Sequence, residues 1–382
     1  MEWKITNIGS LCDRVCSGGT PKSTNNAYYN GNIPWLNTKE VNFNRIYDTE
    51  KNITQLGLEN SSAKWISENS VIVAMYGATA GKVAITKIPI TTNQACCNLS
   101  INSEIADYNF VYYFLCSKFY ELSSLANGGA QQNLNAQIIK DFPIKIPVNL
   151  SDQRKIAGIL SALDSKIENN NKINANLEAQ AEALFKSWFV DFTPFKDQPF
   201  VDSELGPIPQ GWKVGKLGDI CTFKRGKNLL SKNAIDEGVP VVAGGLSPSC
   251  YHNQANTSAP VVTVSGSGAN AGFMRMYHVD VWASDCSFID VSCDYLYFVY
   301  CFLSVNRRLL KHAQTGAVQP HVKPADIHDF DVVIPEEDIV KAFQSIIKEL
   351  LTKVGVNEKE NQRLAALRDT LLPKLMSGEI KL

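Results

Sequence analysis

The chain has 382 residues, of which 45% are hydrophobic and 20% charged, and its net charge is −1. This length suits two or three domains, and the hydrophobic content excludes wholesale disorder. The near-neutral charge excludes a strongly basic nucleic-acid-binding arm, so attraction to phosphates would need local patches or a partner.

The start of the chain and its cysteines favour an intracellular protein. No apolar segment of the signal-peptide kind follows residues 1–4, and the densest apolar run, residues 71–75, is too short to span a bilayer. The ten cysteines include no CxxC pair, which disfavours zinc and favours reduced core cysteines. We expect a soluble, cytoplasmic protein without a metal.

The first domain begins with strand signals. Residues 71–75 and 82–85 predict short strands ended by Gly or Pro, and residues 33–35 predict the end of another strand. The apolar segment 108–117 predicts a helix. In the second half, residues 259–264 and 295–305 carry the corresponding strand and helix signals.

A long helix is predicted after residue 150. Residues 152–188 contain no proline, and Ser151 is a candidate N-cap. Side chains that recur every seven residues predict a seam for pairing with another helix; they are Ile156, Leu163, Asn170, Leu177 and Leu184. An Asn in such a seam can fix the register of paired helices, and the alternative is an exposed Asn where the helices splay apart. Four prolines in residues 193–212 then predict a stiff, extended connection.

The second half of the chain repeats the first. Residues 128–131 and 139–142 match residues 316–319 and 327–330 at an offset of 188, and the glycine loop 77–81 matches 266–272. The seam recurs 187 residues later as Phe343, Leu350, Asn357, Leu364 and Leu371.

The repeat predicts an α+β protein with two pseudo-repeated mixed α/β domains separated by two long antiparallel coiled-coil helices. We expect the first domain at 1–150, the central helix at 151–189, the linker and second domain at 190–335, and the C-terminal helix at 336–382. The alternative for the first third of each helix is packing onto its own globular domain.

Three segments resemble the specificity subunits of type I restriction-modification enzymes. Residues 184–192 (LFKSWFVDF) resemble the middle of these subunits, residues 205–212 (LGPIPQGW) the start of their second recognition domain, and residues 371–380 (LLPKLMSGEI) their C-terminus. The resemblance covers the whole chain in the family's order.

The resemblance implies a subunit that supplies a DNA address and no chemistry. In this family each recognition domain reads one part of a bipartite site on double-stranded DNA, while the paired helices set the spacing and dock two modification subunits. Those subunits bind S-adenosylmethionine and methylate adenine, and two restriction subunits can add ATP-driven translocation and cleavage. We therefore expect no cofactor in this chain, with S-adenosylmethionine, ATP and Mg on partner subunits.

The residues themselves contain no recognisable catalytic set. Residues 77–82 (GATAGK) depart from a phosphate loop, because only three residues separate the glycines and Val83 follows the lysine. The five histidines lack metal-binding spacing, and Asp141 and Asp329 are repeat equivalents rather than a catalytic pair.

Candidate DNA contacts are polar residues in corresponding loops, because sequence readout uses Arg, Lys, Asn and Gln at base edges and hydroxyls at phosphates. They are Asn37, Thr38, Lys39, Lys82, Gln131, Gln132, Asn133, Lys224, Arg225, Lys227, Ser267, Asn270, Gln319 and His321. The alternative for each is a solvated loop side chain. Two other functions stay open, namely a coiled-coil adaptor with two protein-binding heads and a stand-alone DNA-modifying enzyme.

Overall fold

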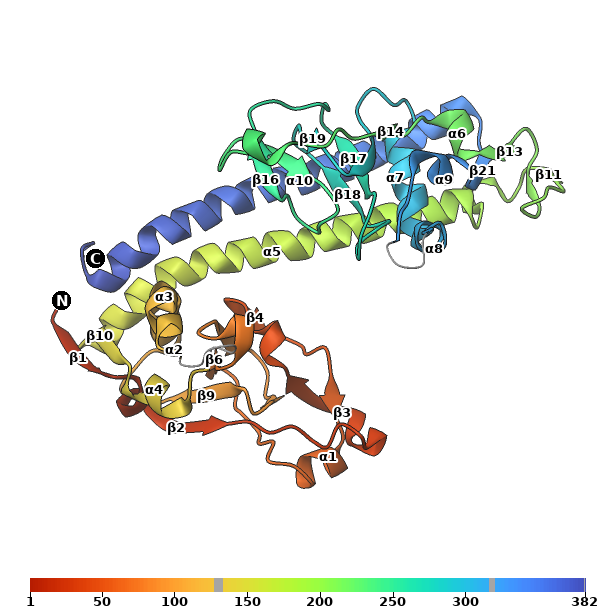
Figure 1. Ribbon diagram of the computed structural model, residues 1–382. Helices are drawn as coiled ribbons and strands as arrows, with labels where there is room; N and C mark the ends of the chain where they lie inside the picture. The colour runs from red at the N-terminus through yellow and green to blue at the C-terminus, as the bar shows by residue number, and fades with distance from the viewer. Residues whose placement is uncertain (127–132, 316–319, 381) are drawn as a thin grey trace. The chain divides into compact units, whose positions relative to one another are not determined.

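The computed structural model describes residues 1–126, 133–315, 320–380 and 382, and they form two compact units (Figure 1). Unit 1 is Met1–Glu168 with Gln362–Leu382, and unit 2 is Asn169–Asn361. Each unit has a mixed α/β body and part of each long helix, so the predicted α+β class and the repeat are confirmed. Across the described ranges, no helix has both the length and the apolar character that crossing a membrane requires.

The body of unit 1 is built on a five-stranded sheet in the order β2-β9-β6-β7-β4 and a smaller sheet in the order β5-β3-β8, while β1 pairs with β10. The helix predicted at 108–117 is α2, whose apolar side chains pack on the larger sheet. The strands are β1 Trp3–Asn7, β2 Cys12–Ser17, β3 Tyr29–Leu36, β4 Asn44–Ile46, β5 Asn52–Ile53, β6 Val71–Ala74, β7 Val83–Thr86, β8 Thr91–Thr92, β9 Cys96–Ile101 and β10 Pro143–Pro147. The α-helices of the body are α1 Gln55–Glu59, α2 Tyr108–Ser117, α3 Phe119–Ser124 and α4 Ala136–Asp141.

Unit 2 repeats this plan with a four-stranded sheet in the order β14-β20-β17-β18 and a smaller sheet in the order β16-β15-β19. The strands are β11 Phe200–Val201, β12 Ile208–Pro209, β13 Lys213–Lys216, β14 Lys224–Arg225, β15 Val239–Val242, β16 Cys250–His252, β17 Val261–Ser265, β18 Met274–Tyr277, β19 Trp282–Ala283, β20 Cys286–Ile289 and β21 Asp331–Ile334. The helices of the body are α6 Leu217–Ile220, α7 Leu296–Val305, α8 Arg307–His312 and α9 Pro324–His328. Short 3-10 turns lie at Ile8–Leu11, Asn26–Tyr28, Thr38–Glu40, Gly77–Thr79, Thr193–Phe195 and Ser231–Asn233.

The long helices are α5 Leu150–Phe189 and α10 Glu337–Ser377. Within unit 2 they run antiparallel, because Phe185 contacts Phe343 while Asn174 contacts Asn357. Within unit 1 they also run antiparallel, since Asp164 pairs with Arg368 and Ile156 shares a core with Leu375. Helix α10 ends at Ser377 because Gly378 takes a left-handed conformation with φ of 79°.

The residues of the predicted seam differ in burial. Ile156, Asn170, Phe343 and Asn357 are buried, whereas the leucines of the seam are only half-buried. A second series, which the sequence analysis did not identify, supplies further buried positions, namely Leu160, Asn174, Ala181, Ile347 and Val354. Ile156 and Phe343 pack into the cores of their own units.

A layer of asparagines joins α5 and α10 within unit 2. Asn170 Nδ2 donates to Asn361 Oδ1 at 2.8 Å, and Asn357 Nδ2 donates to Asn174 Oδ1 at 2.8 Å. These two hydrogen bonds are related by the 187-residue repeat. Because Asn170 and Asn357 are each 1% exposed, neither is the splayed, solvated residue considered above.

Two local expectations are wrong. Ser151 lies inside α5, and Asn149 caps the helix instead, because its Oδ1 accepts the N–H of Ser151 at 2.9 Å. The segment 193–212 is not an extended connector. It contains the β11–β12 hairpin, and the rings of Phe195 and Trp212 are buried with their centroids 5.0 Å apart.

Two glycines in the long helices give a matched test of packing. Gly158 of α5 faces open space, whereas a Cβ atom at position 355 of α10 would lie 2.5 Å from Cγ of His278. We expect Gly158→Ala to raise the free energy of unfolding by about 0.5–1 kcal/mol, because alanine loses less backbone entropy in a helix. Gly355→Ala should lower it by about 1–3 kcal/mol through overpacking. Urea denaturation of both variants tests this, and stabilisation by both would contradict the packing.

Candidate nucleic-acid interface

In each unit, strands of both sheets end at a common edge. In unit 1, β3 and β8 are parallel with Leu36 beside Thr92, and Ala74 at the end of β6 pairs with Cys96. In unit 2, β15 and β19 are parallel with Val242 beside Ala283, and Ser265 pairs with Cys286. We call the turns at these edges the strand-end surfaces. In unit 1 the surface comprises residues 18–20, 37–39, 76–82, 93–95 and 133, and in unit 2 residues 225–227, 243–245, 266–272, 284–285 and 320–321.

A glycine at the same place in each surface permits the close packing of these turns. A Cβ atom on Gly18 would collide with the carbonyl oxygen of Thr92, and one on Gly226 would collide with that of Ser284. Because these glycines have no side chain, the segment after β2 packs directly against the residues that precede β9. In the same way, the segment after β14 packs against the residues that precede β20. The two surfaces share this glycine contact and the pairing of their strands, and they differ in loop length and in side chains.

The strand-end surface of unit 2 gathers several of the predicted residues. Arg225 Nη2 pairs with Asp285 Oδ1, and Ser267 Oγ donates to Asp285 Oδ2. Ser267 also forms a β-bridge with His321. The structure thus brings Arg225 and Ser267 together around one carboxylate, with the backbone of His321 beside Ser267.

The remaining candidates of unit 2 have different surroundings. Asn270 Nδ2 donates to the carbonyl oxygen of Gly244 at 3.2 Å, which ties the glycine loop to the turn after β15. Lys227 is exposed beside Arg225, whereas Lys224 lines a separate hollow with Asp219 and Asp290. Gln319 lies outside the described residues.

The candidates of unit 1 are more engaged in local structure. Asn37 caps the turn at Thr38–Glu40, accepting the N–H of Lys39 at 3.2 Å. The Lys39 ammonium pairs with Glu50, and Lys82 Nζ donates to Asn42 Oδ1 at 2.7 Å. Asn133 forms a β-bridge with Tyr76. Thr38 has its hydroxyl 3.5 Å from Asn37 Oδ1, and Gln131 and Gln132 lie outside the described residues.

The sequence analysis missed three polar residues of these surfaces. Gln94 and Asp285 lie in the corresponding turns before β9 and β20, and the hydroxyl of Thr20 donates to Gln94 Oε1. In the sequence, Gln94 and Asp285 are polar residues just before an apolar strand. This pattern does not belong to any catalytic or phosphate-binding motif, so it did not identify them as candidates.

Two kinds of reactive group can be followed among the described residues, namely clusters of metal ligands and cysteines. No cluster of three or more His, Cys, Asp or Glu side chains among them could hold a metal ion. All ten cysteines are free, and burial raises the pKa of Cys97 and of Cys286 to about 12, so both are protonated thiols at neutral pH.

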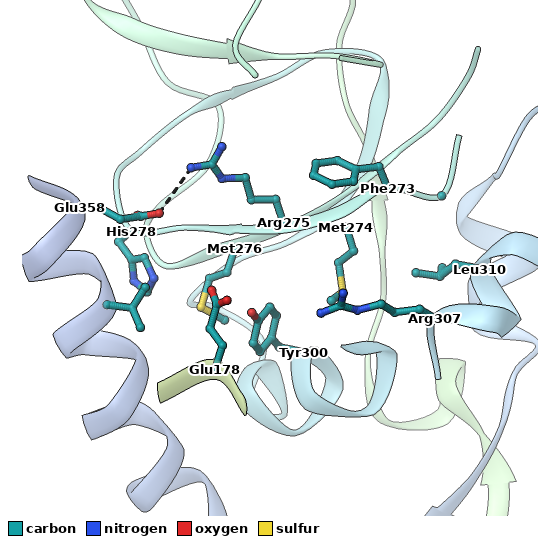
Figure 2. A pocket seen from close by; sticks show the side chains of 12 residues that line it. Glu178, Phe273, Met274, Arg275, Met276, His278, Tyr300, Arg307, Leu310 and Glu358 are labelled. Atoms are coloured by element: carbon teal, nitrogen blue, oxygen red, sulfur yellow. Dashed lines mark hydrogen bonds and ion pairs between the residues drawn. The ribbon is translucent and has the colours of Figure 1, made fainter. Parts of the chain in front are cut away.

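Unit 2 contains a cavity of about 320 Å³ lined by side chains of β18, α7 and the long helices (Figure 2). Met274 and Met276 supply apolar walls, and Arg275 Nη2 lies 3.4 Å from Glu358 Oε1. Arg307 at the rim pairs with Glu182 at 2.9 Å. Because both arginines already contact carboxylates, the cavity is a poor site for a phosphate.

His278 in this cavity gives a pH prediction. Burial, reinforced by the charge of Arg275, lowers the pKa of His278 from 6.5 to about 4. Below pH 6.5 the unfolded chain therefore binds a proton that the folded chain does not, and this residue destabilises the fold increasingly as the pH falls towards 4. As the pH falls from 6.5 to 4, we expect the free energy of unfolding to decrease less in His278→Gln than in the wild type. The difference between the two decreases should reach roughly 3 kcal/mol. Parallel curves of unfolding free energy against pH would contradict this.

Comparison with known proteins assigns the chain to a family. A protein-family model described as the type I restriction modification DNA specificity domain matches residues 1–179 and 209–368. The chain belongs to this family.

Relatives in the specificity-domain family span the whole chain. The specificity subunit of the type I restriction enzyme MjaIX from Methanocaldococcus jannaschii is 30% identical, covering 100% of this chain and 94% of that protein. The HindI specificity subunit from Haemophilus influenzae is 22% identical, covering 99% and 100%. The crystal structure of a type I restriction-modification S subunit from M. genitalium has the same fold, with a TM-score of 0.62, 21% identity and coverage of 98% of this chain and 96% of that one.

Each segment matched by the family model contains one strand-end surface, since the first includes residues 18–133 and the second residues 225–321. The family's specificity domain therefore occurs twice in this chain, in agreement with the repeated topology. The predicted resemblance to type I specificity subunits is confirmed.

Proposed function

We propose that this chain is the DNA-specificity subunit of a type I restriction-modification complex. In this proposal, each strand-end surface reads one half of a bipartite site on double-stranded DNA. The observation that carries the proposal is the pair of corresponding surfaces, which share a backbone frame but present Thr20 and Gln94 in one unit and Arg225 and Asp285 in the other. Different side chains on a common frame suit two half-sites of different sequence.

The partners and cofactors of the complex are part of the same proposal. Two modification subunits dock on the chain, bind S-adenosylmethionine and methylate adenine, and two restriction subunits with ATP and Mg join where the system also cleaves DNA. The net charge of −1 supports this division, because a chain without excess positive charge gains little phosphate attraction by itself. Action on chromosomal DNA places the complex in the cytoplasm.

Binding measurements with and without the modification partner test this proposal. We expect the chain alone to bind a pool of random duplexes weakly, and the chain with its partner to select one split motif. Equal binding of all sequences by the assembled complex would favour the coiled-coil adaptor. Methyl transfer by the purified single chain would favour a stand-alone enzyme.

A further inference from the structure

Two corresponding turns each expose one polar side chain within a buried stretch. Residues 91–99 are buried except for Gln94, which is exposed. Residues 283–289 are buried except for Asp285, whose side chain is 28% exposed. The turn of unit 1 has three residues between its strands and that of unit 2 has two, so they present their polar residue on slightly different backbones.

Each exposed side chain is oriented by a residue of the passing segment that contains Gly18 or Gly226. In unit 1, the Thr20 hydroxyl donates to Gln94 Oε1, which restricts the rotamers open to the carboxamide. One lone pair of Oε1 and the amide N–H groups of Gln94 are then available to a ligand.

In unit 2 the same place is occupied by a charged pair. Asp285 accepts from Arg225 through one carboxylate oxygen and from Ser267 through the other. The Arg225 side chain is 45% exposed, and a guanidinium has five N–H donors, so several remain for a ligand. Asp285 thus holds Arg225 in one orientation.

These groups match the chemistry of base edges. A carboxamide pairs with adenine through N6 and N7, and a guanidinium pairs with guanine through O6 and N7. The orienting contacts at Gln94 and Arg225 reduce the conformational entropy lost on binding.

We propose that Gln94 and Arg225 each read a base of one half-site, and that Asp285 is the positioning residue for Arg225. This inference rests on the proposed function. Gln94 contributes to the half-site of unit 1, and the Arg225–Asp285 pair to the half-site of unit 2. A substitution at one position should therefore change one half of the recognised motif and leave the other half intact.

The test is to map methylated adenines in a host that lacks other adenine methylation and expresses the full chain with its modification partner. Gln94→Ala and Asp285→Asn are compared with the wild type and with two matched exposed controls, Gln55→Ala and Asp202→Asn. We expect each site variant to lower discrimination at a base of a single half-site by roughly tenfold or more. The controls should reproduce the wild-type motif.

The outcomes separate this inference from the proposed function. A wild-type complex that methylates no split motif contradicts the proposed function itself. A wild-type split motif that is unchanged in both Gln94→Ala and Asp285→Asn overturns only the inference. Loss of methylation at all sites, repeated in the conservative variants Gln94→Glu and Asp285→Glu, also overturns it, because a base-reading role predicts an altered motif.

Discussion

Phe343→Ala lowers the free energy of unfolding of unit 2 by about 3–5 kcal/mol, because it leaves a cavity where a fully buried ring packs against other aromatic rings. Phe343 is 0% exposed, and its ring centroid lies 4.8 Å from that of Phe189, 5.7 Å from that of Trp188 and 5.9 Å from that of Phe185. The cluster joins the end of α5 to the start of α10 within unit 2. Urea denaturation followed by tryptophan fluorescence measures the loss, since Trp188 is part of the cluster.

The matched control is Ile346→Ala. Ile346 lies about one turn further along α10, and its side chain is 40% exposed to solvent. We expect that variant to lose less than about 1 kcal/mol. If Phe343→Ala lost no more than Ile346→Ala, the aromatic cluster would not be the junction that stabilises the helix pair in unit 2.

Arg45→Met destabilises unit 1 by about 3–5 kcal/mol, because it removes one partner of a buried polar network. The Arg45 side chain is 6% exposed and runs from β4 to α5. It donates to Ser161 Oγ at 2.8 Å and to Ser165 Oγ at 2.9 Å, and lies 3.3 Å from Glu168 Oε2. The network thus attaches the body of unit 1 to the long helix.

Arg14→Met is the control for this prediction. Arg14 is exposed, and its contact with the carbonyl oxygen of Trp65 is long, at 3.4 Å. We expect a change within about 0.5 kcal/mol there. A loss below 1 kcal/mol in Arg45→Met, measured by the same denaturation, would mean that packing alone fixes the body on α5.

The fold was predictable where a repeated pattern of apolar residues dictated it. The stretch without proline after residue 150 predicted α5, and the seven-residue spacing identified one of the two series that α5 and α10 bury. The second series was missed because it mixes Leu160 with Asn174 and Ala181, so it carries no continuous apolar signal. The hairpin within 193–212 was missed because the four prolines predicted an extended connection. The burial of Phe195 and Trp212 was not considered.

The candidate site was less predictable, because contacts between residues distant in the chain decide it. Asn37 is in a loop of the kind expected, yet its side-chain oxygen is used as a helix cap. Gln94 meets Thr20 across 74 residues of sequence, and Arg225 meets Asp285 across 60. Neither pairing follows from local spacing, and only the folded frame brings them together.

The most direct test of the proposed function is the genome-wide map of methylated adenine with and without this chain, its modification partner being present both times. We expect methylation at one split motif only when the chain is present. An unchanged methylation pattern would contradict a DNA-address role and favour the coiled-coil adaptor.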